Sequence, residues 1–139
     1  MSAAAELKRF ALFADLGEGE REELAALLEE RDLSPGETLF EEGDDADALL
    51  LVVEGRVELR SRRRSDTLSI GAGEVVGGLA LFAVGARAVS AVGGEASALR
   101  VLRREDFLRF AEDQPRAAFR IAAALVADVA QHARAALAE

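Results

Sequence analysis

The sequence predicts one α+β domain, mainly β, that spans residues 1–139. Two observations lead to this prediction. Apolar residues recur at helical spacing in the N-terminal residues 1–30 and again in the C-terminal residues 104–139. Between these ends, residues 31–103 form short aliphatic and β-branched runs separated by glycine-containing turns. Short strands joined by tight turns are typical of a β-sandwich or barrel, so we expect helices, a β-body and helices in that order.

The N-terminal residues are predicted to form two helices. Leu7 and Phe10 lie at helical spacing, Gly17 ends the first helical stretch, and residues 18–30 place leucines on one helical face. Four glutamates lie near the start of this second helix: Glu18, Glu20, Glu22 and Glu23. Negative charge complements the positive end of a helix dipole, so we interpret the acidic run as a feature of the helix and not as a metal site.

The clearest hairpin predicted in the β-body joins the apolar run 49–53 to residues 57–60. Residues 54–56, with a central glycine, would form its turn, and the second arm shows the period-two alternation of a half-buried strand. Three consecutive arginines, residues 62–64, follow at an expected hairpin tip. We interpret this tip as a solvated loop; the alternative is a contact with an acidic partner.

The C-terminal residues are predicted to form a short helix over 104–112 and a long alanine-rich helix that begins at Pro115. The long helix carries an apolar seam with spacings of three and four: Phe119, Ala122, Val126, Val129, Ala133 and Ala136. Ile121 and Leu125 form a second stripe. One stripe could pack on the β-body while the other pairs with a second copy, so a homodimer through residues 115–138 is one prediction. The other prediction is a monomer in which this helix packs on the core of its own domain, because burying alanine side chains stabilises a helix pair only weakly.

The composition excludes several classes of function. The chain carries 26 acidic and 17 basic residues, which gives a formal net charge of −9. This charge disfavours nonspecific binding to nucleic acid or to anionic membranes. It has no cysteine and one histidine, His132, which we interpret as a solvated helix residue. The residues needed for thiol chemistry, for a histidine metal centre or for a Ser-His-Asp triad are therefore missing. No apolar run approaches the roughly 20 residues that cross a bilayer. We expect a cytoplasmic protein that is not an enzyme and binds no metal, membrane or nucleic acid directly.

Residues 77–90 are the strongest candidate site: Gly77-Gly78-Leu79-Ala80-Leu81-Phe82-Ala83-Val84-Gly85-Ala86-Arg87-Ala88-Val89-Ser90. The two glycines let the backbone approach a ligand closely. Small residues beside Arg87 leave room for a phosphate that accepts hydrogen bonds from the planar guanidinium. Two structural alternatives stay open. Arg87 could pair with a carboxylate such as Glu74 or Glu54, and the glycine pair could simply form a tight turn.

Five further segments carry a resemblance to a known family: 12–16, 33–44, 48–57, 71–77 and 99–107. With residues 77–90, they resemble the cyclic nucleotide-binding domains of bacterial catabolite-activator-type regulators, protein kinase A regulatory subunits and gated channels. The resemblance implies an eight-stranded jelly roll flanked by N-terminal helices and a C-terminal helix pair. It also implies that residues 77–90 are the phosphate-binding cassette.

The resemblance further implies which residues would hold a cyclic nucleotide. Arg87 would pair with the cyclic phosphate, and neutral donors would come from the Ala88 N–H and from a short helix near Leu79 and Ala80. The expected ligand-binding residues are Gly77, Gly78, Leu79, Ala80, Arg87, Ala88 and Val89. Candidates for an apolar wall of the pocket are Leu50, Val52 and Val76.

The chain departs from the family pattern at the residue after the first glycine of the cassette. The family has a glutamate there that accepts a hydrogen bond from the ribose hydroxyl, whereas this chain has Gly78, and Ala86 replaces the family's proline before the arginine. A charge-assisted hydrogen bond is worth about 1.5–3 kcal/mol, so its loss should weaken binding by roughly one to two orders of magnitude. We therefore expect a regulatory module with weak or lost cyclic nucleotide binding that signals through its C-terminal helix to a protein partner. The alternative is a true sensor of cAMP, cGMP or another phosphorylated metabolite through Arg87.

Overall fold

The computed structural model describes residues 2–63 and 65–138. These residues group into two compact units, which are described separately. One unit is Leu27–Phe107, and the other combines the residues up to Ala26 with those from Leu108 onward. The single domain over residues 1–139 stays a prediction.

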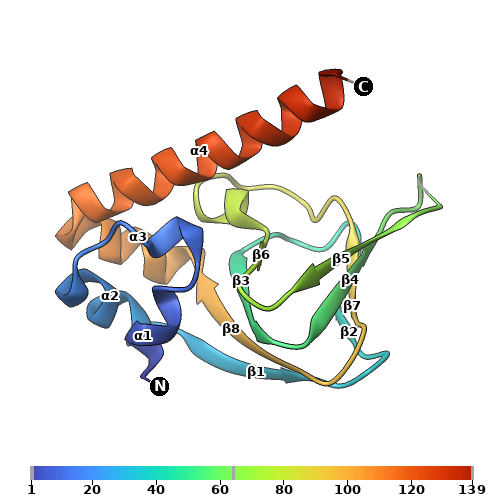
Figure 1. Cartoon of the computed structure of the whole chain (residues 1–139), viewed down its shortest axis with the longest axis horizontal. Coiled ribbons are helices and arrows are strands. Elements are labelled where there is room, and N and C mark those ends of the chain that lie inside the picture. The colour runs from blue at the N-terminus through green and yellow to red at the C-terminus, as the bar shows by residue number, and fades with distance from the viewer. Residues whose placement is uncertain (1, 64, 139) are drawn as a thin grey trace. The chain divides into compact units, whose positions relative to one another are not determined.

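The unit Leu27–Phe107 contains eight strands in two four-stranded antiparallel sheets (Figure 1). The first sheet has the order β1 (Glu29–Leu33), β8 (Ser97–Arg103), β3 (Ala48–Glu54) and β6 (Val75–Val76). The second has the order β2 (Thr38–Phe40), β7 (Ser90–Gly93), β4 (Arg56–Arg60) and β5 (Thr67–Gly71). The predicted α+β fold with eight strands is confirmed.

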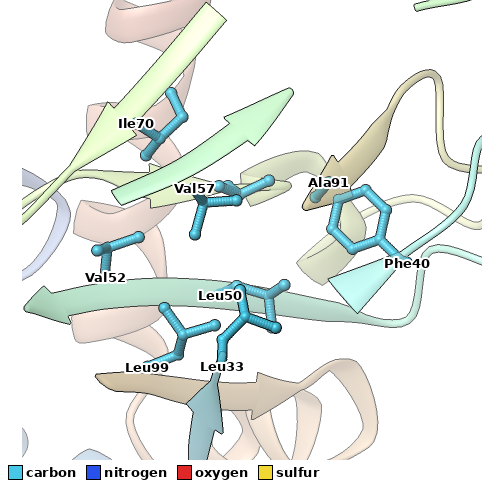
Figure 2. Packing of buried hydrophobic residues seen from close by; sticks show 9 residues of the cluster. Leu33, Phe40, Leu50, Val52, Val57, Ile70, Ala91 and Leu99 are labelled. Atoms are coloured by element: carbon cyan, nitrogen blue, oxygen red, sulfur yellow. The ribbon is translucent and has the colours of Figure 1, made fainter. Parts of the chain in front are cut away.

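Every strand contributes at least one side chain to the hydrophobic core between the two sheets (Figure 2). The cluster consists of Leu33, Phe40, Leu50, Val52, Val57, Ile70, Val76, Ala91 and Leu99. Strand β3 is buried along its whole apolar run, because Leu49 and Leu51, which point away from Leu50 and Val52, are also fully buried. Burying one such side chain contributes about 1.5–3 kcal/mol, so β3 anchors the first sheet.

The predicted hairpin between residues 49–53 and 57–60 is wrong. Strand β3 pairs with β6 and β8 in the first sheet, whereas β4 pairs with β5 and β7 in the second. Gly55 makes the crossover, with φ of +96°, and a Cβ atom at this position would collide with Ser97. The physical reason is that β3 already has a neighbour on each edge, so the chain must leave the sheet after Glu54.

The three-arginine tip lies in the loop that joins β4 to β5, which is the hairpin that the structure does form. Arg62 and Arg63 are exposed, so the interpretation of this tip as a solvated loop holds for them. The Arg62 N–H donates to the Glu42 carboxylate at 3.0 Å, and the Arg63 N–H donates to the Ser61 hydroxyl at 3.2 Å. Arg64 lies outside the described residues.

The second predicted helix ends earlier than expected. Helix α2 spans Glu18–Ala25, and residues 29 and 30, which we predicted to be helical, begin strand β1. Glu29 and Glu30 lie opposite Val101 and Arg100 of β8. Pairing with β8 overrides the local helical pattern, because a strand satisfies its backbone groups through a neighbour that is distant in sequence.

The other unit contains α1 (Ala3–Leu7), the 3₁₀ helix η1 (Ala11–Phe13), α2 and α4 (Pro115–Ala138), while α3 spans Arg104–Asp113. Both C-terminal helices and the position of Pro115 are confirmed. On α4 the stripe of Ile121 and Leu125 is buried, whereas Phe119 and Val126 of the seam are 73% and 66% exposed. Arg120 of α4 lies 3.8 Å from the Glu20 carboxylate. Across the described residues, we find no helix with the length and apolarity that a bilayer crossing requires.

Candidate functional site

The cassette begins with Gly77, which adopts the left-handed conformation that favours glycine, with φ of +78° and ψ of +35°. The 3₁₀ helix η2 (Gly78–Leu81) follows directly, and the Ala80 N–H donates to the Gly77 carbonyl at 3.0 Å. Gly78 is buried as the first residue of this helix. The short helix that we predicted near Leu79 and Ala80 is therefore confirmed.

Arg87 lies against the first glycine of the cassette. A Cβ atom built on Gly77 would collide with Nη1 of Arg87, so the guanidinium would have to shift to accommodate any other residue there. Arg87 is 8% exposed, and its Nη2 donates to the Ala48 carbonyl at 2.9 Å. The guanidinium carbon lies 4.3 Å from the ring centroid of Phe40, a cation–π contact. Its Nε is buried and has no hydrogen-bond partner among residues 2–63 and 65–138, which leaves one donor of this charged group unsatisfied there.

The charges around Arg87 come from the loop before β3. Burial lowers the pKa of Arg87, while the negative charges of Asp47 and Asp44 oppose that shift. The predicted alternative, an ion pair with Glu74 or Glu54, is not what the structure shows. The Glu74 carboxylate instead accepts the Gly71 N–H at 2.8 Å.

The backbone of Arg87 is fixed by the same loop, residues 43–48. The Arg87 carbonyl accepts the Gly43 N–H at 2.9 Å, and the Arg87 N–H donates to the Asp44 carbonyl at 2.7 Å. The Ala46 N–H donates to the Gly85 carbonyl at 2.9 Å, next to a β-bridge between Asp45 and Ala86. These bonds hold the second half of the cassette in register with the loop, so the position of Arg87 is set by both segments.

A pocket of about 380 Å³ opens beside Arg87. Its apolar wall includes Phe40 and Leu50, and its polar lining has five carboxylates and three guanidinium groups: Glu29, Glu30, Asp44, Asp45, Asp47, Arg31, Arg87 and Arg103. Arg103 donates from Nε to the Glu29 carboxylate at 3.0 Å, and this hydrogen bond raises the pKa of Arg103. The polar lining therefore carries a formal excess of negative charge around the buried arginine.

The structure brings only some of the predicted site residues together. Arg87 and Leu50 line the pocket, and Gly77 touches Arg87. The other predicted binding residues do not line it: Gly78, Leu79, Ala80, Ala88 and Val89. The other two predicted wall residues, Val52 and Val76, belong to the core cluster, and Figure 2 shows Val52 there. Val89 is partly buried and packs against the same cluster.

Sequence reasoning missed the residues that hold Arg87. These residues lie about 40 positions earlier in the chain. Phe40 contacts the guanidinium and the Ala48 carbonyl accepts its hydrogen bond. Asp44 and Asp47 place negative charge near it. Residues 33–44 and 48–57 contributed to the family resemblance, but nothing in their spacing indicated contact with the cassette. A backbone carbonyl leaves no trace in residue identity, so no sequence signal could have found that acceptor.

The described residues thus combine two four-stranded antiparallel sheets with a glycine-opened cassette whose buried arginine lies against its first glycine. Residues 30–114 match the family model of the Cyclic nucleotide-binding domain. The chain belongs to the cyclic nucleotide-binding domain family.

Known proteins of this family are similar to the chain over most of its length. It is 37% identical over 111 residues to the Cyclic AMP receptor protein of Thermus thermophilus, covering 76% of this chain and 51% of that protein. The crystal structure of the Thermus thermophilus Catabolite Activator Protein matches with a TM-score of 0.77 at 31% identity, covering 91% of this chain and 59% of that one. The N-terminal domain of a transcriptional regulator from Streptomyces coelicolor A3(2) matches with a TM-score of 0.81 at 32% identity, covering 91% and 94%. The chain thus spans about half the length of the Cyclic AMP receptor protein that it matches.

Proposed function

We propose that this chain is a cytoplasmic, non-catalytic regulatory module whose cassette binds a cyclic nucleotide weakly, with Arg87 as the phosphate anchor. The observation that carries the proposal is the contact between the Arg87 guanidinium and Gly77. This contact brings Gly77, at the start of the cassette, next to Arg87, near its end. An anion bound by Arg87 would therefore also lie beside the backbone at Gly77. Backbone N–H groups of Gly78, Leu79, Ala88 and Val89 are the proposed neutral donors, whereas the Ala80 N–H already donates to the Gly77 carbonyl.

Several features of Arg87 support an anionic ligand. A guanidinium that is largely removed from water interacts strongly with a phosphate, because fewer solvent dipoles screen the pair. Its Nε retains a donor that no described residue of the chain accepts. The pocket volume, about 380 Å³, falls within the range of roughly 300–1,000 Å³ of small-molecule sites. A similar protein carries the name Cyclic AMP receptor protein, which favours a cyclic nucleotide as the ligand class.

Weak binding follows from the residues around that anchor. Gly78 offers no carboxylate to a ribose hydroxyl, and Asp44 and Asp47 place negative charge near the position proposed for the phosphate. Like charges close together oppose binding, and the missing hydrogen bond alone is worth roughly one to two orders of magnitude in affinity. We therefore expect a dissociation constant on the order of 0.1–1 mM for cAMP or cGMP.

Calorimetric titration with cAMP and cGMP tests this function. The proposal expects heat of binding in the wild type and none in Arg87→Met. Equal binding by the wild type and Arg87→Met would show that the ligand lies elsewhere. No binding at millimolar nucleotide would leave the cassette as a structural scaffold and would refute the proposed function.

We also propose that α4 transmits the output through contact with a second copy of the chain. A groove of about 570 Å³ runs along α4 between Phe119 and Arg134, and alanines and Val126 complete its lining. Phe119, Val126 and Val129 are exposed at spacings of seven and three residues, so a twofold-related helix could meet the same residues. A concentration series in an analytical ultracentrifuge tests this, and a monomer at every concentration would contradict it.

A further inference from the structure

A basic segment stands out from the rest of this acidic chain. Residues 56–64 contain five arginines and one glutamate, whereas the whole chain has a formal net charge of −9. Residues 56–63 form β4 and the start of the loop that joins β4 to β5, and these two strands pair as a hairpin (Figure 1). The hairpin therefore carries local positive charge on a chain that is negative overall.

Two of these arginines have side chains that the rest of the molecule does not neutralise. Arg62 and Arg63 are exposed. Within the part of the chain that the structure describes, their hydrogen bonds come from the backbone N–H groups, and neither guanidinium pairs with a carboxylate. Arg60 and Arg56, in contrast, share the Glu58 carboxylate at 3.2 and 3.5 Å. Arg62 and Arg63 can thus bind a carboxylate without first breaking an ion pair.

A hollow of about 400 Å³ opens beside this hairpin tip. Arg60 and Arg62 line it together with the hydroxyl groups of Thr38, Ser61 and Ser90. Guanidinium and hydroxyl groups both donate hydrogen bonds, and a guanidinium matches the two oxygens of a carboxylate in a bidentate pair. The lining is therefore suited to a ligand that presents carboxylate or carbonyl oxygens.

The hollow lies on the face of the second sheet that points away from the hydrophobic core. In β7, Ala91 belongs to the core cluster, whereas its neighbours Ser90 and Val92 line the hollow. Successive side chains of a strand point to opposite faces, so the hollow and the core use alternate residues of β7. The hollow shares no lining residue with the pocket beside Arg87. A partner could bind there without entering that pocket.

Hydrogen bonds hold the hairpin tip against the rest of the hollow. The Arg62 N–H donates to the Glu42 carboxylate at 3.0 Å, and the Glu42 N–H donates to the Ser90 hydroxyl at 2.8 Å. These bonds connect the loop after β4 to the segment after β2 and to the start of β7. The donors of the hollow are thus partly ordered before a partner arrives, which lowers the entropic cost of binding.

We propose that the hairpin tip and the hollow bind a short acidic segment of a partner protein. Its carboxylates would pair with Arg62 and Arg63, and its chain would lie across the hydroxyl groups of the hollow. Screening limits the reach of such charges to about 8 Å at physiological ionic strength, so a short peptide interacts mainly with the basic hairpin. Nucleic acid and anionic membranes extend beyond it and meet the net negative charge of the chain. Charge complementarity therefore favours the short acidic segment.

Fluorescence anisotropy of a labelled synthetic peptide, in which aspartate and glutamate alternate with serine and glycine, tests the proposal. The wild type is expected to bind this peptide at low salt and to lose affinity as the salt concentration rises. Arg62→Gln combined with Arg63→Gln should weaken binding by roughly twofold to thirtyfold, since each exposed ion pair contributes modestly. Both substitutions keep the backbone N–H groups that order the tip. No binding by the wild type at low salt, or equal affinity in the double variant, would overturn the proposal.

A matched control separates the hairpin from the net charge. Arg9→Gln combined with Arg116→Gln removes the same charge from two exposed arginines of the helical unit and should change the affinity by less than about twofold. A loss as large as that of the tip variant would overturn the proposal, because binding would then follow net charge alone. Tighter binding of a single-stranded oligonucleotide or of phosphatidylserine vesicles than of the peptide would also overturn it.

One further variant tests whether the peptide occupies the hollow. Glu41 is an exposed carboxylate in its lining, so it should repel an acidic peptide. Glu41→Gln is expected to tighten peptide binding by about twofold to fivefold. Unchanged or weaker binding in this variant would place the peptide outside the hollow and overturn the proposal.

Discussion

Replacing Arg87 with methionine is expected to remove the ligand response while preserving the fold. The methionine retains an unbranched stem but loses the donor to the Ala48 carbonyl and the contact with Phe40. The hydrogen bond is worth about 1.5–3 kcal/mol and the cation–π contact about 0.5–2 kcal/mol. Removing the buried charge returns several kcal/mol of desolvation penalty, so these effects largely cancel. The net change should stay within about 2 kcal/mol, or less than roughly 10 °C in Tm.

The effect on ligand binding should be larger and separable. With a Kd of about 1 mM, 10 mM cAMP stabilises the wild type by about 1.4 kcal/mol, which is roughly 3–6 °C in Tm for a chain of this size. Arg87→Met should shift by less than about 1 °C under the same conditions, because truncating a buried charge contact to a ligand costs about 2–5 kcal/mol. Arg60→Gln should keep the full wild-type shift. Differential scanning fluorimetry at several cAMP concentrations gives all three values.

Two results would contradict the role given to Arg87. A cAMP-dependent Tm shift in Arg87→Met equal to that of the wild type would refute Arg87 as the phosphate anchor. If Arg87→Met unfolds at room temperature, the expected small change in stability is wrong. The contacts of Arg87 with Ala48 and Phe40 would then outweigh the desolvation penalty of its buried charge. Arg87→Lys should give an intermediate ligand response, since it keeps the charge but loses the planar fork of donors.

Three further changes test other parts of the structure. Gly77→Ala should destabilise the protein more than Gly73→Ala in urea denaturation: both residues have positive φ, worth about 1–2 kcal/mol each, but only Gly77 adds a collision with Arg87. Equal losses would contradict that contact. Ser97→Ala should cost about 1–3 kcal/mol by orphaning the Arg56 N–H, which the Ser97 hydroxyl accepts at 3.1 Å; a neutral effect would argue against the crossover at Gly55. Val126→Glu should shift the protein from dimer to monomer in the ultracentrifuge with little change in Tm, and an unchanged dimer would place the interface elsewhere.

The fold was largely predictable because its signals are local and repeated. Glycine turns at regular intervals predicted many short strands, and helical spacing with Pro115 predicted the two C-terminal helices. The pairing of the strands was not predictable in the same way. Residues 49–53 and 57–60 look like the two arms of a hairpin, but whether a chain reverses within a sheet or crosses to another depends on distant neighbours.

Only part of the candidate site could be predicted from the sequence: the cassette residues, but not the groups that contact them. Arg87 and the glycines stand out because few other residues can do what they do in that pattern. Their partners do not stand out, since the Ala48 carbonyl is a backbone group and Asp44 resembles any turn residue. The predicted wall residue Val76 went to the core instead, because period-two burial alone does not say which inward-facing positions line a cavity.

The comparison of cAMP affinity between the wild type and Gly78→Glu, measured by calorimetry, tests the central claim most directly. Gly78 does not have positive φ, so a glutamate meets no left-handed backbone strain there. The account predicts that Gly78→Glu binds cAMP roughly tenfold to a hundredfold more tightly, since it supplies the missing acceptor for the ribose hydroxyl, and that adding Arg87→Met abolishes the gain. An unchanged affinity in folded Gly78→Glu would contradict the claim that this glycine is what weakens an otherwise intact phosphate cassette.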